Sequence, residues 1–156
     1  MAQKLSTFEQ FAETETFAGK PAPPLLKTTA QQSFETEIRE GAAMGPNFAG
    51  HYTIVTWGCG SSCVSAVVVN ANTGAVHRLP FSNIGFGGPI EFADGSKSMS
   101  DDFEPLLFKL NSRLLMVRGC PGERGCATYY YEWAGEHIKF ITRSPNKHTP
   151  AAGSMK

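Results

Sequence analysis

The chain has 156 residues, with fourteen basic and fourteen acidic side chains and a formal net charge of zero. Nucleic acids and anionic membrane surfaces attract basic proteins, so this balance argues against either as a partner. The longest apolar run, Val64–Val69, is far shorter than the ~20 residues of a membrane span, so no span is predicted. Length and apolar content together predict one globular domain.

The first 28 residues are predicted to form an arm or linker beside this domain. Residues 1–10 are polar and lack the apolar segment of a signal peptide. Two origins fit this start: a mature chain after signal removal, or a cytoplasmic protein whose natural first residue is Met1. The prolines at 21, 23 and 24 then interrupt the apolar spacing of the preceding segment.

Thr29–Ala43 has the pattern of an amphipathic helix. Thr29 and Gln32 are spaced as in a capping box, in which the two side chains bond the first turn of the backbone. Glu35 and Arg39 lie four residues apart, as in an exposed ion pair. The apolar residues recur at every fourth position, which predicts one face against the core: Ala30, Phe34, Ile38 and Ala42.

Strands are predicted for the rest of the domain. Two segments repeat one order of features, Tyr52–Leu79 and Leu114–Ile141: strand, Gly-Cys, loop, Cys, strand, glycine turn, strand. The glycine-rich segment 81–88 is predicted to be a loop, and 89–93 a short strand. The fold class is therefore mainly β (α+β): one domain over residues 29–143, with an antiparallel sheet of two Cys-tipped three-stranded meanders and one amphipathic helix. A disordered tail is predicted for 144–156.

The four cysteines form two close pairs, Cys59 with Cys63 and Cys120 with Cys126. An even cysteine count in a small Gly- and Pro-rich chain favours an oxidising compartment. Each pair brackets a hairpin tip, where facing Cα atoms are ~4.5–5.5 Å apart, so we predict two local disulfides. The alternative is a four-thiolate zinc site, but the gaps of three and five residues differ from those of zinc ribbons. No metal or other cofactor is predicted.

Four side chains are candidates for binding. Glu123 and Arg124 lie between Pro121-Gly122 and Gly125, at the tip closed by the second cysteine pair, and arginine is frequent among binding hot spots. Trp57 borders the first tip. Tyr130 points away from its tyrosine neighbours in a strand, which can create an aromatic surface. A solvated turn and ordinary core packing are the competing interpretations.

Catalytic signals are weak, and no catalytic residue is predicted. His51 precedes the first core strand and has the chemistry of a general base, although hydrogen bonding to backbone is the commoner role. The sequence contains no nucleophile elbow, phosphate-binding loop or zinc-protease histidine pair. The acidic residues Asp94, Asp101, Asp102 and Glu104 lack the spacing of a calcium loop and predict a solvated segment.

Four motifs carry a resemblance to a known group: GPNFAGHY at 45–52, WGCG at 57–60, SRLL at 112–115 and RGCPG at 118–122. Over about residues 30–141 the chain resembles small, mostly uncharacterised bacterial proteins that are made with signal peptides. The resemblance implies export and disulfides, and it implies no activity. A looser likeness is to periplasmic lysozyme inhibitors, some of which insert a disulfide-closed loop into the cleft of the enzyme.

The sequence therefore predicts a periplasmic or secreted, disulfide-stapled binding or inhibitor-like module, with a protein of the cell envelope as its partner. Two alternatives stay open: a structural envelope protein without a tight ligand, and a hydrolase-type enzyme that uses His51. Exposed, rigid Cys tips on one side of the molecule would favour the binding module. A pocket that holds His51 beside a carboxylate would favour the enzyme.

Overall fold

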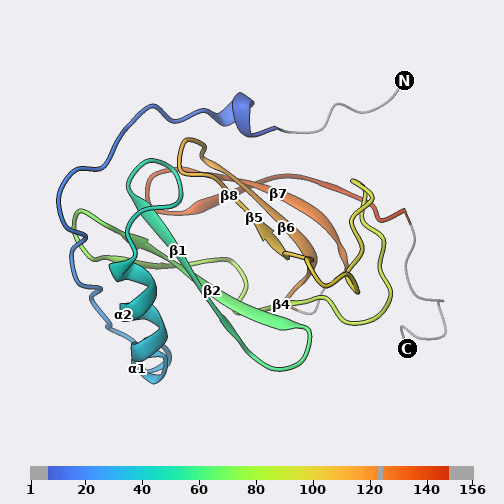
Figure 1. Ribbon diagram of the computed structural model, residues 1–156, viewed down its shortest axis with the longest axis horizontal. Coiled ribbons are helices and arrows are strands. Elements are labelled where there is room, and N and C mark those ends of the chain that lie inside the picture. Colours follow the sequence, from blue (N-terminus) through green and yellow to red (C-terminus); the bar gives the residue numbers. More distant parts are fainter. Residues whose placement is uncertain (1–6, 123–124, 148–156) are drawn as a thin grey trace.

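The computed structural model describes residues 7–122 and 125–147. These residues form one 3₁₀ helix, two α-helices and eight strands (Figure 1). The helices are η1 (Phe8–Phe11), α1 (Thr29–Ser33) and α2 (Glu35–Ala43). The strands are β1 (Tyr52–Gly58), β2 (Cys63–Asn70), β3 (Val76–Arg78), β4 (Ile84–Gly85), β5 (Leu106–Leu107), β6 (Leu114–Pro121), β7 (Ala127–Trp133) and β8 (Ile138–Ser144).

All strands belong to one antiparallel sheet in the order β1-β2-β4-β6-β7-β8, with β3 beside β2 and β5 beside β6. The two predicted meanders are β1-β2-β3 and β6-β7-β8, and both are confirmed. The short strand β4 joins them edge to edge, in a segment that was predicted to be a loop. Within the described ranges no helix has the length and apolarity needed to cross a membrane.

The main hydrophobic core lies between the two halves of the sheet. Ile54 and Val68 from the first half pack with Val117 and Trp133 from the second. These four side chains are buried. Because side chains alternate along a strand, the residues between them point to the outer faces, and each outer face needs its own cover.

Helix α2 covers the outer face of the first half. Ile38 is completely buried against Val55, Val67 and Val69, as the predicted apolar face requires. The backbone at Gly41 lies so close to Val55 that a Cβ on residue 41 would be 2.5 Å from Cγ1 of Val55. The helix therefore rests directly on β1 (Figure 1).

The predicted single helix is wrong in one respect, because it is divided at Phe34. The backbone there has φ −116° and ψ 32°, outside the helical region, and Phe34 ends α1 and begins α2. The capping box is formed by Thr28 and Gln31, one residue earlier than predicted. The predicted surface pair is present, with Nε of Arg39 2.8 Å from Oε2 of Glu35.

The segment between β4 and β5 covers the outer face of the second half. Its anchor is Arg118, whose guanidinium donates to the Glu104 carbonyl through Nε (3.1 Å) and Nη2 (2.5 Å) and to Asp94 Oδ2 through Nη1 (3.1 Å). The predicted strand 89–93 is not formed; the only pairing of that segment within the described residues is an isolated bridge between Glu91 and Lys97. The predicted solvated acidic loop is thus tied down at Asp94.

The N-terminal segment was predicted to be an arm or a linker, and the structure shows an arm that lies on the core. The amide of Glu13 donates to the Asn111 carbonyl, and the amide of Leu25 donates to the Gly74 carbonyl, both at 2.8 Å. These contacts attach the arm at two points along its length, so its path is fixed by backbone hydrogen bonds.

The disordered tail was predicted to begin at residue 144, which is too early in the chain. Ser144 is the buried last residue of β8, and the amide of Lys147 donates to the Glu91 carbonyl at 2.9 Å. Residues 144–147 therefore pack against the domain, because this stretch has backbone partners. Residues 148–156 lie outside the described part of the chain.

Candidate binding site at the paired disulfide tips

Both predicted disulfides are present, Cys59–Cys63 and Cys120–Cys126. Each closes the first hairpin of its meander, and the Cα atoms are 5.2 Å and 4.0 Å apart. No thiolate is left for the zinc alternative, since no cysteine is free. Over the described ranges no cluster of three or more histidine, cysteine, aspartate or glutamate side chains is placed to hold a metal ion.

Strand β4 brings the two tips together. Gly85 pairs with Cys63 on one side and with Cys120 on the other, so these three residues form a row across adjacent strands. Neighbouring strands are about 4.8 Å apart, which places the Cα atoms of the two cysteines roughly 10 Å apart. Two tips from different halves of the sequence therefore emerge side by side.

Backbone hydrogen bonds tie the β4 segment to both tips. The amide of Phe86 donates to the Ser62 carbonyl in the first tip at 2.9 Å. The amide of Gly122 in the second tip donates to the Asn83 carbonyl at 2.8 Å. Each tip is thus fixed twice, by its disulfide and by β4.

The close approach of β6 to β4 depends on Gly119. A Cβ at residue 119 would lie 2.6 Å from the Gly85 carbonyl oxygen and 2.8 Å from Cγ2 of Ile84. Its φ of 156° is also at the limit of what other residues adopt readily. A larger residue would therefore separate the second tip from β4.

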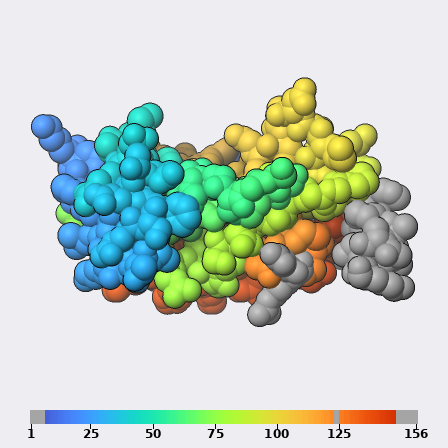
Figure 2. Space-filling view, turned by 90° about the horizontal axis from the view of Figure 1, so that it is seen from below, coloured from blue at the N-terminus to red at the C-terminus, as the bar shows by residue number. Residues whose placement is uncertain are grey.

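These elements form one exposed surface, which we call the paired-tip edge: residues 58–62, 85–88, 122 and 125. Residues 58–62 are all exposed, as are Gly122 and Gly125. In Figure 2 the green first tip, the yellow-green β4 segment and the orange second tip follow one another across one face. The edge is rich in glycine and serine, so its backbone is accessible.

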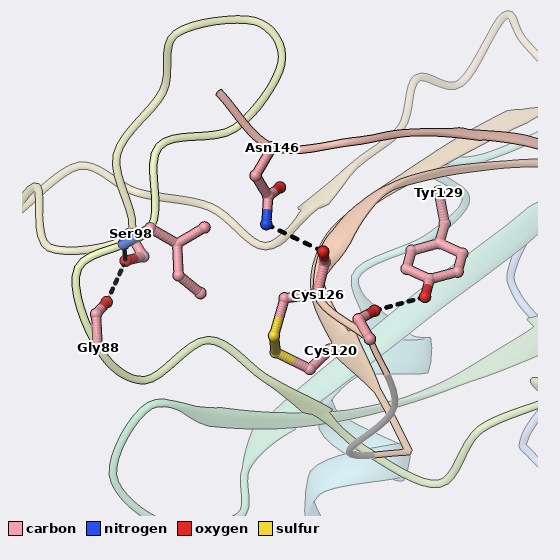
Figure 3. The surroundings of a disulfide bond; sticks show 8 residues. Gly88, Ser98, Cys120, Cys126, Tyr129 and Asn146 are labelled. Carbon is pink, nitrogen blue, oxygen red and sulfur yellow. Dashed lines mark hydrogen bonds between the residues drawn. A yellow bond between two sulfur atoms is a disulfide. The ribbon is translucent and has the colours of Figure 1, made fainter. Parts of the chain in front are cut away.

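The second tip has further supports (Figure 3). The hydroxyl of Tyr129 donates to the Gly125 carbonyl at 2.5 Å, and Nδ2 of Asn146 donates to the Cys126 carbonyl at 2.9 Å. The guanidinium of Arg143 lies over the Tyr129 ring, 5.6 Å from its centre. The strand end that carries the tip is therefore held by β8 and by the residues after it.

A groove of about 380 Å³ adjoins the paired-tip edge, between the helices and the outer face of β1 and β2; we call it the helix groove. Trp57 forms part of its wall and stacks on Phe34 with ring centres 5.0 Å apart. The groove shares Asn83 with the β4 segment. Its lining consists of Thr28, Ala30, Gln31, Phe34, Ile38, Trp57, Ser65, Ala66, Val67, Arg78, Leu79, Phe81, Ser82 and Asn83.

The four predicted binding residues do not meet in one place. Trp57 lines the helix groove. Tyr130 is 2% exposed, so the prediction that it forms a surface is wrong: it is the neighbouring Tyr129 and the 52% exposed Phe140 that reach solvent. The loop segment covering the outer face of the second half explains this, because it buries the face on which Tyr130 lies. Glu123 and Arg124 lie outside the described residues.

The aromatic cluster around Tyr129 continues into the core. Tyr131 lies 6.3 Å from Tyr129 and 5.9 Å from Phe140, measured between ring centres. Burial, with a smaller effect of Tyr129, raises the pKa of the Tyr131 phenol to about 12. Tyr131 is thus a neutral core residue at all physiological pH values.

His51 has a carboxylate partner in the N-terminal arm. Its Nδ1 lies 2.5 Å from Oε2 of Glu15 in the N-terminal arm, within ion-pair distance but without hydrogen-bond geometry. The imidazole stacks on Tyr52 with ring centres 4.2 Å apart. It lines neither the helix groove nor the polar cavity beside Arg118. The arrangement fits an attachment of the arm better than a catalytic base.

The sequence interpretation missed the helix groove and the convergence of the tips. Gln31 and Arg78 line the groove but carry no motif, and β4 is two residues long, too short for a periodic pattern. One signal was available: Ile84 is the single large aliphatic residue in the glycine-rich loop, and it is completely buried.

No protein-family model matches the chain, and neither a curated protein nor a solved structure matches it. The suggested resemblance to small exported bacterial proteins stays a prediction.

Proposed function

We propose that this chain is an exported, disulfide-stapled module that binds a protein of the cell envelope through the paired-tip edge. The observation that carries the proposal is the row formed by Cys63, Gly85 and Cys120, which sets two exposed, covalently closed tips side by side. The proposal extends the sequence interpretation, in which one tip was expected to bind.

Rigidity is the physical basis of the proposal. A surface whose loops are already fixed loses little conformational entropy on association, so more of the contact energy appears as affinity. The tips are fixed by disulfides and by the hydrogen bonds from Phe86 and Gly122. Glu123 and Arg124 stand between Gly122 and Gly125 of this edge in the sequence, and the proposal assigns them its charged contacts.

The proposed location outside the cytoplasm rests on the disulfides. Thiols are kept reduced in most cytoplasms, whereas disulfides persist in the periplasm and in secreted proteins. All four cysteines of this small chain are paired. That usage supports export, and export supports a partner in the cell envelope.

The test is a pull-down from periplasmic extract with the oxidised protein, followed by measured affinities of variants for the captured partner. Ser61→Arg places a bulky charge on the exposed first tip, and Glu123→Ala/Arg124→Ala removes the charges of the second. We expect both variants to lose at least ten-fold in affinity. The melting temperature of Ser61→Arg should be unchanged, because an exposed residue contributes little to stability.

Ser33→Arg is the matched control, since it adds the same side chain at an exposed position on α1. A partner that binds both tip variants as tightly as the control would refute a role for the edge. Absence of any partner in the extract would favour the structural alternative.

A further inference from the structure

Gln31 lines the helix groove, and hydrogen bonds hold its side-chain amide in one orientation. Gln31 is 8% exposed, and its Oε1 accepts hydrogen bonds from the amides of Lys27 (2.8 Å) and Thr28 (3.3 Å). Because the oxygen is held by two donors, the orientation of the amide group is fixed, and Nε2 is its remaining polar atom. No described residue accepts a hydrogen bond from Nε2. A largely buried residue therefore presents an amide donor without a described protein acceptor at the wall of a cavity.

A cationic side chain lines the same cavity as this donor. Arg78 lines the helix groove together with Gln31, and both also line a second cavity of about 360 Å³. Arg78 is exposed and forms no ion pair with a described residue. Thr28, Gln31 and Arg78 line both cavities and thus mark the boundary between them.

The surrounding charges favour an anion at this boundary. Lys27 adds a second cation in the second cavity, against the single carboxylate of Glu136. Burial lowers the pKa of His77, which lines the same cavity, and outweighs the opposite effect of Glu136. His77 is therefore neutral near pH 7 and adds no charge.

The rest of the helix groove is apolar. Ile38 and Val67 form its floor between α2 and β2, and Trp57, Phe34 and Leu79 complete the apolar wall. The volume of about 380 Å³ is at the small end of ligand pockets, which span roughly 300–1,000 Å³. The groove suits a compact apolar body with one polar end at Gln31 and Arg78.

We propose that the helix groove binds a small carboxylate that carries an aliphatic or aromatic body. The carboxylate accepts hydrogen bonds from Nε2 of Gln31 and from the guanidinium of Arg78, and the body packs against Trp57. Arginine presents a fork of donors that matches a carboxylate. This ligand site goes beyond the proposed function: it lies beside the paired-tip edge and uses different residues.

A carboxylate attached to an apolar body occurs both in a free acid and at the C-terminus of a peptide. Octanoate serves as the free acid, and an acetylated tripeptide ending in phenylalanine serves as the peptide. Octanol is the matched neutral probe for octanoate. Binding is followed by the fluorescence of Trp57, with Trp57→Phe to identify the signal, because the other tryptophan, Trp133, is buried in the main core.

We expect octanoate to bind with at least ten-fold higher affinity than octanol, and more tightly than the tripeptide because the groove is small. Arg78→Gln should weaken octanoate about ten-fold or more, the effect of losing a hydrogen bond to a charged group. Gln31→Glu keeps an acceptor for the amides of Lys27 and Thr28, but it replaces the Nε2 donor with a carboxylate oxygen. The negative charge introduced there would repel the carboxylate of octanoate, so this substitution should abolish binding.

Gln32→Glu is the matched control, because it makes the same change at the next, exposed residue, outside the groove lining. It should bind octanoate like the wild type. Tighter binding of the tripeptide would assign the site to peptide C-termini within the same chemistry. Equal affinity for octanol, or unchanged octanoate binding by Gln31→Glu, would overturn the proposal. Neither result would affect binding at the paired-tip edge, which is measured with Ser61→Arg.

Discussion

Replacement of Gly41 by alanine tests how closely α2 packs on the sheet. Gly41 lies inside α2, and a Cβ there would be 2.5 Å from Cγ1 and 2.9 Å from Cγ2 of Val55. Val55 is buried, and its branched side chain has few alternative rotamers. The clash can therefore be relieved mainly by a shift of the helix, which would also disturb the contacts of Ile38.

Two effects of known size oppose each other in Gly41→Ala. Alanine is about 1 kcal/mol better than glycine inside a helix. Overpacking of a filled core costs about 1–3 kcal/mol, and a separation of 2.5 Å points to the upper part of that range. We therefore expect the free energy of unfolding to fall by about 1–2 kcal/mol, with a melting temperature several degrees lower.

Urea denaturation of the oxidised protein, followed by circular dichroism, measures this change. The matched experiment introduces Gly41→Ala into a Val55→Ala background, where the colliding atoms are absent. There the substitution should stabilise the protein by about the helix-propensity difference of 1 kcal/mol. If Gly41→Ala alone is stabilising and shows no coupling to Val55→Ala, then the close contact of α2 with β1 is refuted.

Ile38→Ala should cost about 2–5 kcal/mol of unfolding free energy in the same urea assay, because Ile38 is completely buried; Phe34→Ala should cost less, since Phe34 is 36% exposed. The pKa of Tyr131, raised to about 12, means that the folded state keeps the phenol proton longer than the unfolded state, so stability should fall as pH rises from about 10 to about 12. Tyr131→Phe should remove that loss in alkaline denaturation curves, and an unchanged curve would contradict the assignment. The pKa of Asp94 is lowered: burial alone would raise it, but hydrogen bonds from Ser96 and the charge of Arg118 outweigh burial. Asp94 therefore stabilises the fold above its ordinary pKa and loses this effect as pH falls through the lowered value, so Asp94→Asn should flatten the acid limb of stability measured between pH 7 and pH 3.

Features set by neighbouring residues were predictable from the sequence. Each disulfide joins cysteines at a separation of four or six residues, so a hairpin tip was sufficient to define the pairing. The buried face of α2 followed from the spacing of Ile38 and Ala42. The helix start was displaced by one residue because Thr28 and Thr29 are both good caps, and the sequence does not say which one bonds.

Features set by distant residues were not predictable. The pairing of β4 is fixed by partners about twenty residues earlier and about thirty-five residues later, and two residues carry no periodicity. The error at Tyr130 has a related cause. Alternation along β7 shows that Tyr129 and Tyr130 point to opposite faces of the sheet. The two faces are covered to different extents, which alternation does not reveal. The cover over Tyr130 comes from the loop held by Arg118, whose position depends on tertiary contacts.

The position of β4 explains why the disulfides are local. A bridge between Cys63 and Cys120 would close a much longer loop and, in the chain-entropy model, stabilise the fold more than the about 2 kcal/mol of each short loop. However, Gly85 lies between these residues in the sheet, and Cα atoms roughly 10 Å apart exceed the ~7 Å limit for a disulfide. The same strand that brings the tips side by side therefore keeps their cysteines from cross-linking. As a result each disulfide defines the shape of one tip, while the attachment of one half of the sheet to the other depends on β4 and the shared core.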